Sequence, residues 1–455
     1  MNTAGEGEHR PAASVGAIFR RILANAGKLL GGRAVNAVLS LAYTAVTARA
    51  LGVNGLGVLV MINAFAQLLG DVVKFQSWQT VLQYGAEPLK ARRLEDLHRV
   101  VRFTMLLDIA SGVLGVLVGV VGAFVFGPQL GWSQAQAPLA AGYIASVFFM
   151  TAAAPLGILR LLDRFDVLAT NAAVISLVRL AGCGVGYLLH ADLAFFLAVW
   201  ALGTIAGYVQ LLVVAWREMG RQDLRRGFRW LGPTRVRAAG VWRFAWATNL
   251  NATVSVAFTH LVTLMVGALL GPAEAALWRI GRQVADAIAK PVKLMTPALY
   301  PELVRLLVEG REREMWRLTA RIALTASGVG LLLLAVSGLG GAPLLHLVMG
   351  PGFAAAAGIM TWQVAAAVIN LISLPLEPMV ITLGRAGATV WVRVVAAAAF
   401  VAALPLLVPH YGLTAAGAGL VASNAAIAMG MLWLLMQQHA AGRGGKSLDQ
   451  TPPAR

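Results

Sequence analysis

The chain has 455 residues, of which 58% are hydrophobic and only 13% are charged, and its mean hydropathy is +0.73. Soluble proteins carry about 45–50% apolar and about 25% charged residues, so the composition excludes an ordinary soluble protein and indicates a polytopic membrane protein. The formal net charge of +17 would suggest a nucleic-acid partner for a soluble chain, but in a membrane protein an excess of Lys and Arg marks the cytoplasmic side, and we predict no nucleic-acid partner.

The first 28 residues are polar and basic, without a compact apolar core and small-residue cleavage site, so we predict a cytoplasmic segment and no cleaved signal peptide. After them, apolar runs long enough to cross a bilayer recur along the chain. We predict twelve transmembrane helices, near residues 29–50, 56–82, 100–126, 138–158, 166–189, 193–216, 244–270, 274–304, 319–339, 355–384, 387–408 and 413–437. The single cysteine, Cys183, excludes an intramolecular disulfide, and the sequence offers no Cys/His cluster for a metal, so no cofactor is expected.

Lys and Arg are distributed unevenly among the connections between these helices. Six of the eleven connections contain none, namely 52–55, 127–137, 190–192, 271–273, 340–354 and 409–412. The others contain clusters, with Lys90, Arg92, Arg93 and Arg99, then Arg217, Arg221, Arg225, Arg226, Arg229, Arg235 and Arg237, then Arg305, Arg311, Arg313 and Arg317. Because positive residues remain in the cytoplasm, we predict a multi-pass protein of the bacterial inner membrane with both termini cytoplasmic.

A shift of 219 residues brings the two halves of the chain into partial register. The shift places Gly52 on Gly271, Lys74 on Lys293 and Arg92 on Arg311, and a shared offset over three helices indicates an internal repeat. We therefore predict a cytoplasmic N-terminal segment at 1–28, an N-lobe at 29–216, a basic cytoplasmic linker at 217–243, a C-lobe at 244–437 and a polar tail at 438–455. Six helices per repeat give both lobes the same orientation, and transport folds of this kind hold their substrate between the lobes near the midplane.

The segment RIGRQVADAIAKPVK, residues 279–293, places five charges inside the predicted eighth helix. The spacing of these charges puts them within an arc of roughly 80°, and they are Arg279, Arg282, Asp286, Lys290 and Lys293. A central Arg or Lys facing lipid costs about 2.5–3.5 kcal/mol, so the four cations must face a wet cavity or protein partners. Buried ion pairs alone do not account for them, because one acid cannot neutralise four bases.

Polar residues on other predicted helices add to the polar surface that these charges form. The first helix contributes Arg33, Asn36, Ser40, Thr44 and Thr47, the seventh contributes Ser255, Thr259 and Thr263, the second contributes Asp71 and Lys74, and the fifth contributes Arg179. For the small hydroxyl residues, helix packing is at least as good an explanation as cavity lining. We interpret His260, on the seventh helix, as a hydrogen-bonded packing residue in preference to a proton relay.

The tenth helix carries a candidate coupling residue. Gln363, Asn370 and Glu377 recur every seven residues, and Pro375 and Pro378 flank the glutamate. Glu377 lies on a less charged stripe beside a helix break, so we predict that it is the proton site. Asp286, expected to stay ionised among its cations, and Asp71 are further coupling or gating candidates.

A cationic, water-filled cavity between two lobes attracts an anionic substrate, and phosphate is the natural partner of clustered Arg and Lys. The predicted substrate-binding residues are Arg33, Lys74, Arg279, Arg282, Lys290 and Lys293.

Two stretches resemble a known family. ARALGVNGLGVLVMINAFAQLLGDVVKFQSWQTVLQYGAE is similar to the segment from the first to the second helix of polysaccharide-biosynthesis flippases, and TPALYPELVRLLVEGREREMWRLTARI is similar to their approach to the ninth helix. The chain thus resembles the lipid-linked oligosaccharide (O-antigen and polysaccharide) flippases of the multidrug and polysaccharide exporter superfamily, over roughly residues 15–435. The resemblance implies a V-shaped, all-α fold of twelve helices in two lobes, alternating access, and transfer of undecaprenyl-diphosphate-linked sugars to the outer leaflet. It also implies membrane lipids and a polysaccharide polymerase or export machinery as partners, and a transporter that is not an enzyme.

Three other functions remain open on the sequence. Lipid II flippases of the same superfamily typically have fourteen helices, whereas twelve are predicted here. A cation-coupled drug antiporter favours an acid on the first helix, which here carries Arg33. A membrane glycosyltransferase or polymerase needs a sizeable loop with catalytic carboxylates, and the longest loop, 217–243, is short and basic.

Overall fold

The computed structural model describes residues 15–236, 240–293, 305–306, 309, 311–382 and 385–448, without the side chains of 15–34, 250–252, 254–257, 288–293, 312, 386 and 438–448. The described residues form helices and no strand, in the order α1 (Val15–Val73), α2 (Ser77–Lys90), α3 (Leu94–Phe126), α4 (Gln136–Ile144), α5 (Val147–Met150), α6 (Ala154–Leu161), α7 (Phe165–Leu188), α8 (Leu193–Arg221), α9 (Val241–Leu270), α10 (Pro272–Lys293), α12 (Glu312–Met349), a 3₁₀ turn (Pro351–Phe353), α13 (Ala356–Ile372), α14 (Leu376–Thr382) and α15 (Ala386–Leu448).

These elements account for the twelve predicted spans, except that residues 294–304 of the predicted eighth span lie outside the described residues. Both α1 and α15 contain two spans each, joined at glycines whose backbone leaves the helical region, Gly52 (φ 68°) and Gly412 (φ 60°). The second half of α1 continues into α2, α4 to α6 together form the fourth span, and α13 with α14 forms the tenth. By length and apolarity, eight helical stretches of the described chain qualify as membrane-spanning, two of which (Val35–Lys90 and Gly387–Gln437) each contain two spans. The chain is therefore an all-α, multi-pass membrane protein.

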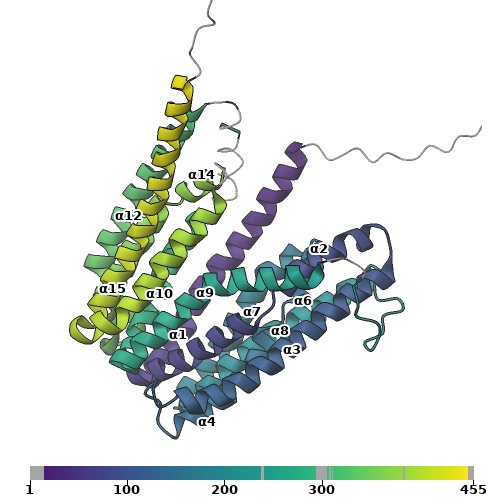
Figure 1. The fold of residues 1–455 in the computed structure, drawn as a ribbon. Helices are drawn as coiled ribbons and strands as arrows, with labels where there is room; N and C mark the ends of the chain where they lie inside the picture. Colours follow the sequence, from purple (N-terminus) through teal and green to yellow (C-terminus); the bar gives the residue numbers. More distant parts are fainter. Residues whose placement is uncertain are drawn as a thin grey trace, which may run out of the picture.

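The helices form two lobes arranged as a V (Figure 1). One arm contains α2 to α8, and the other contains α10 to α15. The arms meet where α1 and α10 pack together, and the apolar core at this vertex joins Leu56 and Val60 of α1 to Ile280 of α10 and Met360 of α13. The N-lobe has its own core around Phe196, Trp200 and neighbouring helices. The apolar core at the vertex therefore joins the two arms.

The vertex of the V is closed by backbone contact. A Cβ at Gly57 would overlap the carbonyl oxygen of Pro272 at the start of α10, so only glycine permits this approach. Nearby, the Arg49 guanidinium donates to the carbonyl oxygens of Leu347 and Val348, the last of which lies 3.1 Å away. These carbonyls belong to the final turn of α12, where intrahelical partners run out. The end of α1's first span therefore caps a helix of the opposite lobe.

Helix α9 follows the linker and lies across the two arms. Its first half packs on the N-lobe, with Trp246 against Phe75 (ring centroids 5.0 Å apart) and Phe244 against Tyr84 (5.7 Å). The Asn249 amide donates to the Lys74 carbonyl at 2.5 Å. A helix that the sequence places at the start of the C-lobe therefore begins against the N-lobe (Figure 1).

The internal repeat is visible in the backbone. Gly52 (φ 68°, ψ −176°) and Gly271 (φ 106°, ψ 169°), which the 219-residue shift superposes, adopt nearly the same left-handed extended conformation between consecutive helices. The same offset separates Gly131 (φ 73°) from Gly350 (φ 108°). Non-glycine residues avoid this region. Two glycine turns at equal spacing support the duplication that the sequence predicts.

The arms separate at the end that carries the basic connections. The connections 91–93 and 222–236 and the start of α12 lie at the far ends of the arms, away from the vertex (Figure 1). From the distribution of Lys and Arg we predict that this open end faces the cytoplasm.

Candidate functional site

The charged face of α10 meets the N-lobe in a cavity of about 250 Å³ between the arms. From α10 come Arg279, Gln283 and Asp286. The facing wall is polar and aromatic, with Asn36, Ser40, Tyr43 and Thr44 of α1, Ser176 and Arg179 of α7, and Trp200 of α8. The sequence had placed most of these polar residues on one wall. We refer to this space as the inter-lobe cavity.

A pair of hydrogen bonds crosses this cavity from one lobe to the other. The Gln283 amide donates to the Ser40 hydroxyl at 2.8 Å, and the Thr44 hydroxyl donates to the Gln283 carbonyl oxygen at 3.4 Å. Thr47, one turn further along α1, does not face the cavity but donates to the Cys183 sulfur at 3.3 Å inside the N-lobe. The predicted polar stripe of the first helix is therefore divided between cavity and core.

Arg179 supplies a fixed cation on the N-lobe side. Its guanidinium donates to the Trp200 carbonyl (3.1 Å), the Thr204 hydroxyl (3.0 Å) and the Tyr43 hydroxyl (3.3 Å). The guanidinium carbon also lies 4.9 Å from the centroid of the Trp200 ring, within cation–π range. Gly203 lies against the Arg179 side chain, where a Cβ would collide with it. Four neighbours thus hold this charge in place at the cavity wall.

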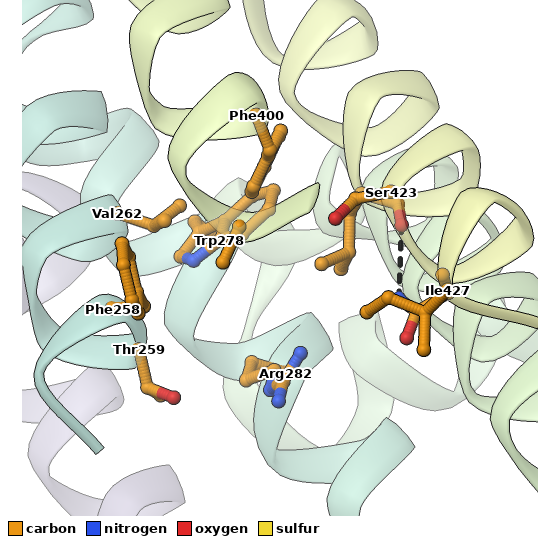
Figure 2. A pocket seen from close by; sticks show the side chains of 11 residues that line it. Phe258, Thr259, Val262, Trp278, Arg282, Phe400, Ser423 and Ile427 are labelled. Carbon is orange, nitrogen blue, oxygen red and sulfur yellow. Dashed lines mark hydrogen bonds between the residues drawn. The ribbon is translucent and has the colours of Figure 1, made fainter. Parts of the chain in front are cut away.

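Arg282 points into a second pocket, of about 230 Å³, inside the C-lobe between α9, α10 and α15. The rings of Phe258, Trp278 and Phe400 line this pocket. Thr259 lies below Phe258, and Ser423 lies on the wall opposite to these two residues (Figure 2). Among the described residues the Arg282 Nε has no hydrogen-bond partner, and Asp286 Oδ1 lies 3.4 Å away. We call this space the C-lobe pocket. It combines an aromatic wall with an incompletely paired guanidinium.

Asp71 and Lys74 lie beside charged or ionisable residues of other helices. His260 Nε2 of α9 lies 3.3 Å from Asp71 Oδ2, so this pair joins the lobes. Lys74 interacts electrostatically with Asp71 and with Asp108 of α3. Neither Asp71 nor Lys74 lines the inter-lobe cavity or the C-lobe pocket. The contact with Asp71 agrees with the interpretation of His260 as a packing residue. The roles of Asp71 in gating and of Lys74 in substrate binding stay predictions.

Glu377 has a charged neighbour that the sequence analysis did not expect. Its Oε2 accepts a hydrogen bond of 2.5 Å from Arg393 of α15, so the expectation of a weakly charged neighbourhood is wrong, because a cation 16 residues further along the chain packs against it. The expected helix break is present, because α13 ends at Ile372 and α14 starts at Leu376. Asn370, on the same stripe, donates to Asn424 at 3.0 Å within the C-lobe. The assignment of Glu377 as a proton site stays a prediction.

Three predicted substrate-binding residues lie beyond what the structure describes. The side chains of Arg33, Lys290 and Lys293 are outside the described residues, although α1 and α10 include their backbone positions. Their place in the cavity therefore stays a prediction.

Sequence reasoning missed the aromatic parts of both sites. The chain has 28 Phe and Trp residues, and no spacing in the sequence distinguishes the aromatic residues of the two sites, which are Tyr43, Trp200, Trp278 and Phe400. A weak signal existed at Tyr43, which lies three residues after Ser40 and therefore near the face of the predicted stripe.

These features define a class of protein. The fold is that of transporters of the MOP superfamily. An inward-facing multidrug resistance MATE family transporter of this superfamily matches with a TM-score of 0.72 and 14% identity, over 90% of this chain and 96% of that one. A MATE crystal structure in a bent conformation matches with a TM-score of 0.57 and 15% identity, over 92% and 96%. A MOP superfamily transporter from Pyrococcus furiosus Vc1 (DSM3638), described as having a binding pocket of reverse polarity that suggests a different function, matches with 0.57 and 17%, over 92% and 96%.

No protein-family model matches the sequence. The chain is 32% identical over 333 residues to inner membrane protein YghQ of Escherichia coli (strain K12), a match that covers 73% of this chain and 93% of that protein. The chain belongs to the family of this inner membrane protein.

Proposed function

We propose that this protein is a flippase that moves an undecaprenyl-diphosphate-linked oligosaccharide from the inner to the outer leaflet, for cell-surface polysaccharide biosynthesis. The observation that carries the proposal is the charge of the region between the lobes. Arg179 and Arg279 border the inter-lobe cavity, Arg282 borders the adjoining C-lobe pocket, and Asp286 is the one acid lining either space among the described residues. A surplus of guanidinium groups at membrane depth favours an anion.

The two spaces suit the two polar parts of such a substrate. A diphosphate matches the planar donor forks of Arg279 and Arg282, which are on adjacent faces of one helix. The aromatic wall of the C-lobe pocket, with Thr259 and Ser423, offers an apolar surface and hydroxyl groups of the kind that bind sugar rings. The lipid tail has no need of a protein site, because it stays in the bilayer.

Transport follows from exchange between two arrangements of the lobes. In the arrangement seen here the vertex is sealed by Gly57 against Pro272 and by Arg49 on the end of α12. Release on the other side requires these contacts to break while the arms close at the basic end. Glu377, Asp286 and Asp71 remain our candidates for coupling this exchange to an ion, and Asp71 paired with His260 bridges the lobes. A polymerase or export machinery would receive the product.

A cation-coupled drug antiporter is the second candidate, because one structure of this fold is described as a multidrug resistance MATE family transporter. The charge of the two spaces argues against a cationic drug. A glycosyltransferase or polymerase is the least supported candidate, since the described connection between α8 and α9 carries Asp223 as its single acid.

The test is translocation in proteoliposomes by the full-length protein, with a labelled polyprenyl-diphosphate sugar in one arm and a cationic dye in the other. The double change Arg279→Ala/Arg282→Ala removes two charge-assisted contacts, so we expect flipping of the lipid diphosphate to fall by roughly tenfold to a hundredfold. The matched control, Arg313→Ala/Arg317→Ala, removes two exposed arginines of α12 and should change the rate by less than about twofold. Transport of the dye without transport of the lipid diphosphate would reject the proposal.

A further inference from the structure

A separate pocket lies at the basic end of the N-lobe, away from the space between the arms. It has a volume of about 530 Å³ and is formed by Phe103 of α3, the last described residues of the linker, and the first residues of α9. Pockets for small ligands and cofactors fall between about 300 and 1,000 Å³. None of its lining residues contributes to the inter-lobe cavity or the C-lobe pocket, so the proposed transport site does not account for it.

The polar wall of this pocket is cationic. Arg235 of the linker and Arg243 of α9 both line it and both are exposed. The structure shows no acidic group lining this pocket, and within the described residues neither arginine forms an ion pair. Two unpaired guanidinium groups facing one space are suited to a phosphate group, which can accept two forked donors at once.

The remaining wall is aromatic and continues onto an apolar surface. The rings of Phe103 and Trp242 meet edge to face with centroids 5.2 Å apart. Trp242 and Trp246 of α9 are 57% and 59% exposed, and Leu231 of the linker is fully exposed. Exposed Trp beside Arg, at the end of membrane-spanning helices, is the composition of the membrane–water interface. The pocket therefore lies at the depth of lipid headgroups.

We propose that this pocket binds the headgroup phosphate of an anionic phospholipid, with Arg235 and Arg243 on the phosphate and Trp242 and Phe103 against the start of the acyl chains. Basic pockets between helices on the cytoplasmic side are a recurrent form of lipid headgroup site. The exposed ring of Trp242, which lines the pocket, favours a membrane lipid over free phosphate, because a soluble ion gains nothing from an apolar contact.

The position of the pocket gives the lipid a regulatory role. The buried Arg102 of α3 donates to the Pro233 carbonyl at 2.8 Å and so fastens the linker to the N-lobe. The chain then turns at Gly240 (φ 82°) into α9, whose Trp242 rests on Phe103. A lipid between Arg235 and Arg243 bridges the fastened linker and the start of α9, and it stabilises the arrangement in which α9 begins against the N-lobe.

The experiment measures lipid binding to the full-length detergent-solubilised protein by native mass spectrometry, with phosphatidylglycerol, phosphatidylcholine and inorganic phosphate as separate arms. We expect Arg235→Gln/Arg243→Gln to weaken phosphatidylglycerol binding by roughly tenfold. The matched control, Arg226→Gln/Arg229→Gln, removes the same charge from exposed positions of the same linker outside the pocket, and it should retain affinity within about twofold.

A second measurement distinguishes a specific site from surface charge. Phosphatidylglycerol should raise the unfolding temperature of the wild type and of the control variant, and it should not do so for the pocket variant. Equal loss of lipid affinity in both double variants would overturn the proposal, as would displacement of the lipid by inorganic phosphate at equal concentration.

Discussion

A carboxylate buried in the membrane part of the N-lobe illustrates how single residues maintain this fold. Asp108 of α3 accepts hydrogen bonds from the Ser77 hydroxyl at 2.5 Å and from the backbone N–H groups of Ala153 and Ala154, both at 2.7 Å. The two N–H groups belong to the start of α6, where the fourth span is interrupted and intrahelical acceptors are missing. An interrupted backbone in a membrane is tolerated where protein groups satisfy it. Asp108 therefore makes this break possible.

The substitution Asp108→Ala leaves three buried donors without an acceptor, so we expect a loss of about 3 kcal/mol or more in the free energy of unfolding. The measurement is thermal or denaturant unfolding of the purified protein. Asp108→Asn keeps one acceptor oxygen at nearly the same volume and should fall between the wild type and Asp108→Ala. Equal stability of all three proteins would contradict the role assigned to this residue.

The sequence predicted the spans and the repeat well, because both depend on local composition and spacing. It did not predict Asp108, since a lone acid within an apolar helix has no partner that can be read from the chain. It also did not predict the pairing of Glu377 with Arg393, because that contact depends on how two helices pack. Long-range contacts of single side chains are set by packing, which a pattern along one helix does not encode.

At the scale of one element, α10 separates two spaces. The sequence placed its charges on a single arc, yet Arg279 and Asp286 line the inter-lobe cavity while Arg282 lines the C-lobe pocket. Arg282 is rotated by about 60° from Arg279 around the helix. A helical wheel gives the arc of charges, but it cannot show that the arc borders two different spaces.

Cysteine labelling of α10 tests this division. In a Cys183→Ser background, Arg279→Cys and Gln283→Cys should react quickly with a charged thiol reagent, because both positions border the inter-lobe cavity. Ile280→Cys serves as the control on the same turn, since Ile280 is completely buried, and it should react at least about tenfold more slowly. Equal labelling at the three positions would mean that α10 does not border a wet cavity.

At the scale of the whole molecule, the sealed vertex governs which side is open. The seal depends on glycine, because Gly57 lies directly against the backbone of Pro272. Arg49 adds a polar contact to the same junction. Both contacts join opposite lobes, so the free energy of the arrangement seen here depends on groups far from the substrate site.

The change Gly57→Ala introduces a methyl group where no space exists, so we expect it to destabilise the sealed vertex by about 1–3 kcal/mol and to shift the population towards opening at that end. The measurement is reactivity of Gln283→Cys, in the Cys183→Ser background, to a membrane-impermeant reagent added on the outer side. The control is Gly184→Ala in α7, where nothing lies within 4 Å of the added carbon. Unchanged outer reactivity in Gly57→Ala would show that the seal does not limit access.

The docking of α9 on the N-lobe also bears on how the chain is made. Synthesis proceeds from the N-terminus at roughly 5–20 residues per second, so α9 emerges while the N-lobe is complete and α15, its later neighbour, is still unmade. Phe75, Tyr84 and the Lys74 carbonyl offer α9 a finished surface during that interval of several seconds. We therefore expect the first helix of the second repeat to dock on the N-lobe, and to be less exposed to aggregation, before its own lobe is made.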